Sequence, residues 1–246
     1  MAMELGMTMK LGEKEAPAIA LPKIVLEMTT HVTSVAPDGT ISYEFHGTSA
    51  KAIGAPGVKP DVLAKIQGEI AKVSGIKGNA VVDSHGYARD VQIEMPPDLD
   101  PSVQQMADSV RSSLRQILNP LPEEPVGIGA KWDAEHRLPM AGTFMKQIAH
   151  STLIARNGSK YSLAIELEQS AVPQALQLPN LPQGTQAKLV SLVGKGKGEL
   201  KGDLARVTPI AWTMTLESRS TIEVSQGGES HPLSSSMTLK MDMKSR

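Results

Sequence analysis

Hydrophobic and polar residues alternate strictly at both ends of the chain. Residues 7–11 read Met-Thr-Met-Lys-Leu, and residues 237–241 read Met-Thr-Leu-Lys-Met. A third segment of this kind, Trp-Thr-Met-Thr-Leu, occupies residues 212–216. A period of two is typical of a β-strand that buries one face. We therefore predict a mainly antiparallel β protein whose inner face is rich in methionine.

The same alternation along the chain predicts where the strands lie. They are expected at residues 3–11, 23–36, 40–47, 129–137, 143–156, 159–169, 209–224 and 233–244. Because unpaired edges with this pattern invite aggregation, the two terminal strands are expected to lie in one continuous sheet.

Two segments have the spacing of a helix instead. Residues 60–73 form the first, and residues 101–118 form the second, which begins after Asp100 at Pro101 and stops before Pro120. We expect the second helix to cover a face of the sheet. Its apolar stripe, the predicted lining of a ligand cavity, consists of Val103, Met106, Val110, Leu114 and Ile117.

An internal similarity relates residues 31–39 to residues 150–158. The first segment ends in Asp38-Gly39 and the second in Asn157-Gly158, both favoured pairs in hairpin turns. We predict a first β half with two helices at 1–120, a Pro/Gly linker at 121–130 and a second β half at 131–246, together one continuous domain. Chance similarity between two amphipathic hairpins is the alternative.

The predicted fold class is therefore mainly β (α+β). We expect a large curved antiparallel sheet or half-barrel, built from two related halves and covered by one or two helices.

The linker carries the pattern Pro122-x-x-Pro125-Val126-x-x-Gly129-x-x-Trp132. This pattern resembles a motif in uncharacterised families of bacterial secreted proteins and lipoproteins. The wider pattern of strands is similar to LolA-like or LppX-like envelope proteins, a resemblance that implies a bent sheet whose concave side holds acyl chains. It also implies a location in the bacterial periplasm or cell envelope, or secretion, with the leader absent from this chain. A cytoplasmic location is the alternative.

Composition narrows the partners. The net charge of −1 over 246 residues argues against nucleic acid, which requires a concentrated basic surface. Thirteen methionines and an aromatic content of only 3% indicate a soft, adaptable interior. The absence of cysteine excludes disulfides and thiolate chemistry, and no apolar run is long enough for a transmembrane segment.

Candidate catalytic groups are few. Neither a nucleophile elbow nor a phosphate-binding loop motif occurs, and Gly194–Gly198 (Gly-Lys-Gly-Lys-Gly) is interpreted as a basic strand edge or loop. Residues 83–86, Asp-Ser-His-Gly, are interpreted as a hairpin turn rather than part of a catalytic triad. We predict no catalytic residues, no cofactor and no metal site.

Three nearby side chains could suggest a metal site but are better explained by a solvated strand. On one strand, Asp133 and Glu135 share a face and His136 points to the other.

Two further alternatives concern histidine and methionine. His31 and His150 are expected to bond to a neighbouring strand, with a shared site as the alternative. If the terminal strands pair, the methionines at 7, 9, 241 and 243 would cluster as soft ligands for copper(I), although core packing is favoured.

The leading functional hypothesis is a non-enzymatic bacterial envelope protein that binds a lipid or another apolar ligand in a cavity lined by Met and Leu. The alternatives are a structural or protein-interaction module with a solid core, a periplasmic Met/His metal handler and, last, an enzyme of unfamiliar type. A protein partner is left open.

Overall fold

The computed structural model describes residues 1–11, 14–15, 19–71, 74–94, 120–177, 182 and 184–245. At residues 5, 7, 9–11, 14, 15, 19 and 20 it describes the backbone alone.

The described residues form fourteen strands and one helix. The strands of the first half are β1 (Ala2–Leu11), β2 (Lys14–Glu15), β3 (Ile19–Ala20), β4 (Lys23–Val35), β5 (Ile41–Ile53), β6 (Lys77–Val82) and β7 (Ala88–Glu94). The helix α1 (Pro60–Ala71) lies between β5 and β6. The second half contains β8 (Lys131–Met140), β9 (Thr143–Asn157), β10 (Lys160–Ala171), β11 (Gln174–Leu176), β12 (Gln186–Asp203), β13 (Ala211–Gln226) and β14 (Glu229–Lys244).

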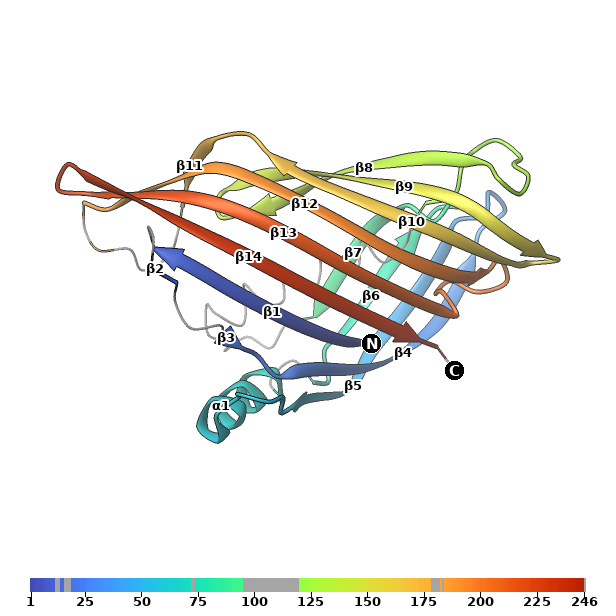
Figure 1. The fold of residues 1–246 in the computed structure, drawn as a ribbon. Coiled ribbons are helices and arrows are strands. Elements are labelled where there is room, and N and C mark those ends of the chain that lie inside the picture. The colour runs from blue at the N-terminus through green and yellow to red at the C-terminus, as the bar shows by residue number, and fades with distance from the viewer. Residues whose placement is uncertain are drawn as a thin grey trace.

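All of these strands belong to one antiparallel sheet. Its main path runs β7-β6-β5-β4-β1-β14-β13-β12-β10-β9-β8, and β2, β3 and β11 pair at its sides. Figure 1 shows the sheet curving so that β5, β6 and β7 pass behind β12 and β13. The path ends at β7 and β8 and does not close on itself. The predicted fold class, a large curved antiparallel sheet in a mainly β protein, is confirmed.

The two ends of the chain lie side by side in the middle of this sheet, as Figure 1 shows. β1 and β14 pair along their length, with Met3 opposite Met241 and Met7 opposite Met237. The predicted pairing of the terminal strands is confirmed. It joins strands from both halves into one sheet, and the other edge of β1 is paired in part by β4, β3 and β2.

The two similar hairpin turns occupy corresponding places in this topology. Asp38-Gly39 joins β4 to β5, and Asn157-Gly158 joins β9 to β10. The strand before the first turn, β4, also pairs with β1, and the strand before the second turn, β9, also pairs with β8. The strand after the first turn, β5, pairs with β6, and the strand after the second turn, β10, pairs with β12. The relation between the two halves themselves stays a prediction.

The interpretation of Gly194–Gly198 as a strand edge or loop is wrong. These residues lie inside β12, which pairs with β10 on one side and β13 on the other. The glycines lie on the buried side, where a Cβ at Gly196 would come 3.3 Å from side-chain atoms of both Leu167 and Leu216. The lysines point outward, and Lys197 forms an ion pair with Glu166 at 3.0 Å. A Cβ at Gly196 would also come 3.1 Å from the backbone oxygen of Thr215, so neighbouring side chains and backbone together favour glycine here.

The predicted helix at 60–73 is present as α1, which packs against β5. Beyond Lys77 and its partner His46, β6 no longer pairs with β5. There the Gln67 side chain accepts a hydrogen bond from Ala52 N at 2.7 Å and donates one to Ala50 O at 3.2 Å. It thus replaces a missing strand on that edge. The second predicted helix, 101–118, lies outside the described residues. Among the residues that the structure describes, no helix is long and apolar enough to cross a membrane.

Buried side chains gather in three clusters. The largest, between β8 and β13, contains Ala134, Ala149, Leu153, Leu163, Ile165, Leu167, Leu200 and Met214. The second, in β5–β7, contains Tyr43, Phe45, Ala80, Val82, Val91 and Ile93, and the third contains Leu176, Ala187 and Leu189. We call the face of the sheet that carries these clusters the inner face.

Candidate ligand-binding face

The inner face continues across the three central strands as rows of apolar residues. In one row Met214, Met241 and Met3 are successive cross-strand partners in β13, β14 and β1. In the next row Leu216, Leu239 and Leu5 are partners in the same way. The Met-rich face expected from the terminal alternation therefore exists at the level of strand register.

The side chains in these rows are less buried in β14 than in β13. In β13 the side chains of Met214 and Leu216 are buried, at 3% and 5% exposure. In β14 the inner-face residues Met237, Leu239 and Met241 are only half-buried. Large apolar side chains in β14 are thus left accessible to a ligand, although Met241 also packs against the largest core cluster.

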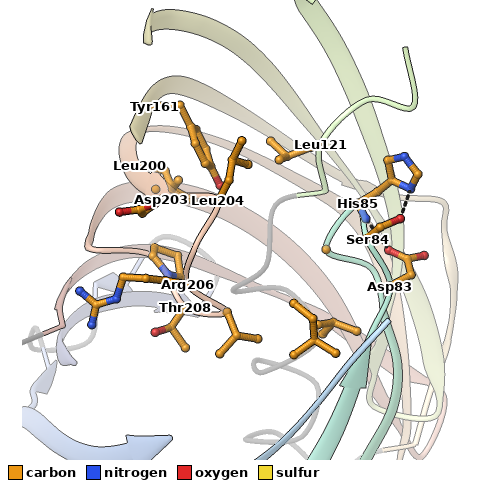
Figure 2. A pocket seen from close by; sticks show the side chains of 16 residues that line it. Asp83, Ser84, His85, Leu121, Tyr161, Leu200, Asp203, Leu204, Arg206 and Thr208 are labelled. Carbon is orange, nitrogen blue, oxygen red and sulfur yellow. Dashed lines mark hydrogen bonds between the residues drawn. The ribbon is translucent and has the colours of Figure 1, made fainter. Parts of the chain in front are cut away.

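A separate pocket lies at one end of the sheet, between the β6–β7 turn and the β12–β13 loop. Its volume is about 100 Å³, and Figure 2 shows Tyr161 and Leu204 on one side and His85 on the other. Burial, together with the nearby charge of Asp203, raises the pKa of the Tyr161 phenol. The linker helps to form the pocket, since Leu121 N donates a hydrogen bond to His85 O at 2.7 Å.

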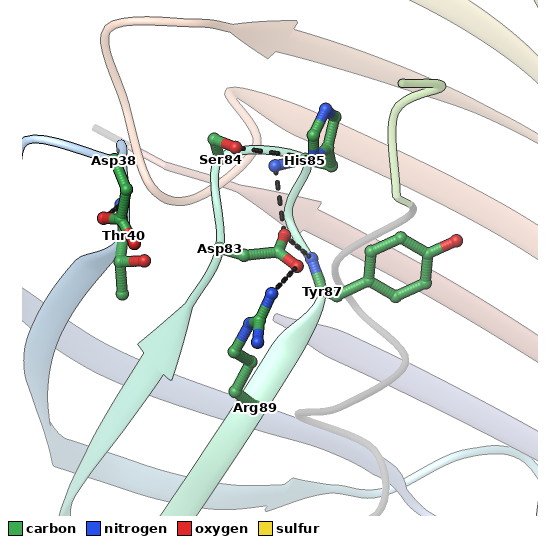
Figure 3. Close-up of polar contacts among 7 residues, drawn as sticks. All are labelled: Asp38, Thr40, Asp83, Ser84, His85, Tyr87 and Arg89. Atoms are coloured by element: carbon green, nitrogen blue, oxygen red, sulfur yellow. Dashed lines mark hydrogen bonds and ion pairs between the residues drawn. The ribbon is translucent and has the colours of Figure 1, made fainter. Parts of the chain in front are cut away.

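The Asp-Ser-His-Gly segment at 83–86 is the turn between β6 and β7, as predicted. Figure 3 shows the Asp83 carboxylate accepting hydrogen bonds from the backbone N of His85 at 3.0 Å and of Tyr87 at 2.9 Å. Its other oxygen pairs with Arg89 at 3.3 Å. The His85 ring lies 3.4 Å from the Ser84 hydroxyl. The carboxylate therefore orders the turn and does not orient the imidazole.

The residues Asp133, Glu135 and His136 are divided between two faces, as predicted. Asp133 and Glu135 point outward, where they bond His150 and Lys146, each at 2.7 Å. His136 lies on the inner face, and burial lowers the pKa of its imidazole. Across the described ranges, no three His, Asp or Glu side chains gather in a way that could hold a metal ion.

The predicted hydrogen bond of His150 to a neighbouring strand is confirmed by its contact with Asp133 on β8. A site shared with His31 is not formed, because β1, β14, β13, β12 and β10 lie between the strands of the two histidines.

The alternative of a cluster of four methionines is not formed in this register. Met7 faces Met237 and Met9 faces Ser235, so both are displaced along the strand from Met241. Four residues of strand separate Met237 from Met241, a distance of about 13 Å.

The five residues predicted to line a cavity, Val103, Met106, Val110, Leu114 and Ile117, lie outside the described residues. The half-buried apolar side chains that the structure does describe on the central strands are those of β14 and of Met3 in β1, two strands that the terminal alternation predicted.

Fold and site together define an open, strongly curved antiparallel sheet protein with an accessible apolar inner face. No family model and no curated protein matches the chain.

Proposed function

We propose that the protein is a non-enzymatic binding protein of the bacterial envelope, and that it holds an apolar, lipid-like ligand against the inner face of its sheet. The single observation that supports this most is the half-burial of Met237, Leu239 and Met241 on β14. Elsewhere on this face, in β10 and β12, the side chains of Leu163, Leu167 and Leu200 are buried and cannot be reached by a ligand.

The chemistry of these side chains suits an alkyl chain. Methionine is unbranched and adapts to ligands of varying shape, and leucine adds apolar area. Burial of each methylene group contributes about 0.8 kcal/mol. Lengthening a bound chain by two carbons is therefore expected to raise its affinity about tenfold.

This dependence on chain length is testable with neutral ω-bromoalkanols of 8, 10 and 12 carbons. The chain has two tryptophans, Trp132 and Trp212, and both pack against the largest core cluster of the inner face. Bromine quenches their fluorescence at contact, so a titration gives both the affinity and the face of binding. Absence of binding by all three alcohols would refute the proposal.

Neighbouring residues on β14 provide a matched pair of variants. Leu239→Gln places a polar amide on the inner face and is expected to weaken binding of 12-bromododecanol about tenfold or more. Thr238→Gln places the same group on the opposite face and leaves the affinity unchanged. Equal effects of the two substitutions would contradict binding at the inner face.

Location is part of the same proposal and is supported by the linker motif around Pro122 and Trp132. Fractionation of the native host, followed by immunoblotting, is expected to recover the protein with the envelope or periplasm. Recovery in the cytoplasm would overturn this part alone.

A protein-interaction module is the second candidate. It is favoured by the two ends of the sheet, since β7 and β8 each pair with a single strand in the part of the chain that the structure describes. Failure of alkyl binding, combined with capture of an extended peptide at either edge, would support this alternative.

A further inference from the structure

A band of polar side chains crosses the otherwise apolar inner face. Cross-strand partners place His136, Gln147, Gln169, Gly194 and Ser218 in one row over β8, β9, β10, β12 and β13. One step along the strands, Ser220 and Ser235 are partners in β13 and β14. We call these seven residues the polar belt.

The centre of the belt is deeply buried. Gln147 and Gln169 are only 7% and 8% exposed, and Gln169 Nε2 donates a hydrogen bond to Gln147 Oε1 at 2.8 Å. A carboxamide can donate two hydrogen bonds and accept two. Within the described residues this mutual bond is the one that the two amides make, so Gln147 Nε2 and Gln169 Oε1 keep capacity for a ligand. Neither atom is among the fully buried side-chain polar atoms of the described residues that lack a partner, so both remain accessible to water or to a ligand.

Gly194 leaves the Gln169 amide open. A Cβ on Gly194 would lie 3.0 Å from Gln169 Oε1 and 3.2 Å from the Cβ of Ser218. The amide oxygen therefore extends over a strand position that carries no side chain. Beyond it the belt becomes accessible, because Ser218, Ser220 and Ser235 are half-buried, and the hydroxyls of Ser220 and Ser235 lie 2.8 Å apart.

The belt carries no formal charge. Its rows contain no carboxylate, ammonium or guanidinium, and burial lowers the pKa of His136, its one titratable group, which keeps the ring neutral at pH 7. A charged head group would find no counter-charge and would lose its hydration. A neutral group that both donates and accepts hydrogen bonds matches the two glutamine amides.

Apolar residues flank the belt on both sides. Towards one end of the strands lie Leu167, Leu216 and Leu239, and towards the other lie Leu189 and Ile222. A molecule bound here would place a polar group at the belt and an alkyl chain along an apolar flank.

We infer that the polar belt recognises the amide group of a long-chain acyl amide, whose chain lies on the neighbouring apolar rows. This inference rests on the proposed function, because it names the ligand class for the same inner face.

The test compares three probes of equal chain length: 12-bromododecanamide, 12-bromododecanol and 12-bromododecanoate. The wild-type protein is expected to bind the amide about tenfold more tightly than the alcohol and the carboxylate least tightly. In the double variant Gln147→Leu/Gln169→Leu, the amide is expected to lose this advantage, while the alcohol retains its affinity within about twofold. Removing both amides avoids leaving one of them buried alone.

Single variants keep the inference testable if the double variant does not fold, as judged by circular dichroism. Ser235→Ala on the inner face is expected to weaken amide binding several-fold, whereas Ser236→Ala, its outward-facing neighbour on β14, leaves it unchanged. Gly194→Ala displaces the Gln169 amide and is expected to act like the double variant.

The outcomes separate the two proposals. If no probe binds the wild-type protein, the proposed function fails. If the alcohol binds but the amide has no advantage, or keeps its full advantage in the folded belt variants, the amide recognition is refuted and the apolar-ligand function stands.

Discussion

Gly202 allows a tyrosine ring to lie across β12, and Gly202→Ala tests this packing. Gly202 and Tyr161 are cross-strand partners. A Cβ added at Gly202 would lie 2.2 Å from Tyr161 Cζ and 2.4 Å from the Tyr161 hydroxyl oxygen. The three atoms nearest to this added Cβ all belong to the Tyr161 side chain. An alanine at this position therefore forces the ring, and not the backbone, to move.

The expected loss follows from the area that the ring would expose. A tyrosine buries about 200 Å², and re-exposing half of it at about 25 cal/mol per Å² costs about 2.5 kcal/mol. Replacing glycine by alanine inside a strand returns about 0.5–1 kcal/mol. The free energy of unfolding should therefore fall by about 2 kcal/mol.

Urea unfolding followed by tryptophan fluorescence measures this change, and a double-mutant cycle isolates its cause. In a Tyr161→Ala background the clash is absent, so Gly202→Ala should be neutral or slightly stabilising. Gly6→Ala is the control, since Gly6 also lies in a strand but its nearest atom, Thr238 O, is 4.0 Å from the added Cβ. An equal cost of Gly202→Ala in both backgrounds would refute the argument.

Three further predictions concern the edge, the register and the acid stability of the sheet. Gln67→Leu removes both hydrogen bonds to the β5 edge. It should lower the stability by about 1 kcal/mol and speed hydrogen exchange at the Ala52 amide, and unchanged exchange would contradict the capping role. Because the chain has no cysteine and Thr8 is paired with Ser236, Thr8→Cys/Ser236→Cys should form a disulfide under mild oxidation. Thr8→Cys/Asp242→Cys should not, and the reverse result on non-reducing gels would disprove the register. A hydrogen bond from Thr40 lowers the pKa of Asp38, and one from Lys197 lowers the pKa of Glu166. A hydrogen bond from Ala205 lowers the pKa of Asp203. Carboxyls with a lowered folded-state pKa stabilise the protein above their unfolded pKa of about 4, so this contribution is lost as the pH falls below that value. In Asp38→Asn/Glu166→Gln/Asp203→Asn the acid-induced drop of the urea midpoint should be shallower, and an unchanged drop would count against these contacts.

The strands and turns that depend on local chemistry could be predicted from the sequence. Apolar alternation placed β4, β9 and β10 within a few residues of their bounds. The turns at Asp38-Gly39 and Asp83 follow from side chains that bond their own backbone, such as Asp38 Oδ1 with Thr40 N at 2.9 Å.

β12 could not be predicted in this way. Its glycines have no side chain to produce an apolar period, because the side chains that cover them belong to β10 and β13. The signal that identifies this strand is therefore carried by its neighbours and emerges only when the strands are paired.

The alternation of the terminal segments determined, by itself, that both ends are strands with a Met-rich face. The register of β1 against β14 decided which methionines are cross-strand partners. It placed Met7 opposite Met237, which excludes the alternative of one cluster of four methionines. The polar belt likewise exists only in the folded sheet. Gln147 and Gln169 are unremarkable in their own strands, and they become a buried hydrogen-bonded pair because antiparallel pairing sets residues that are distant along the chain directly opposite each other.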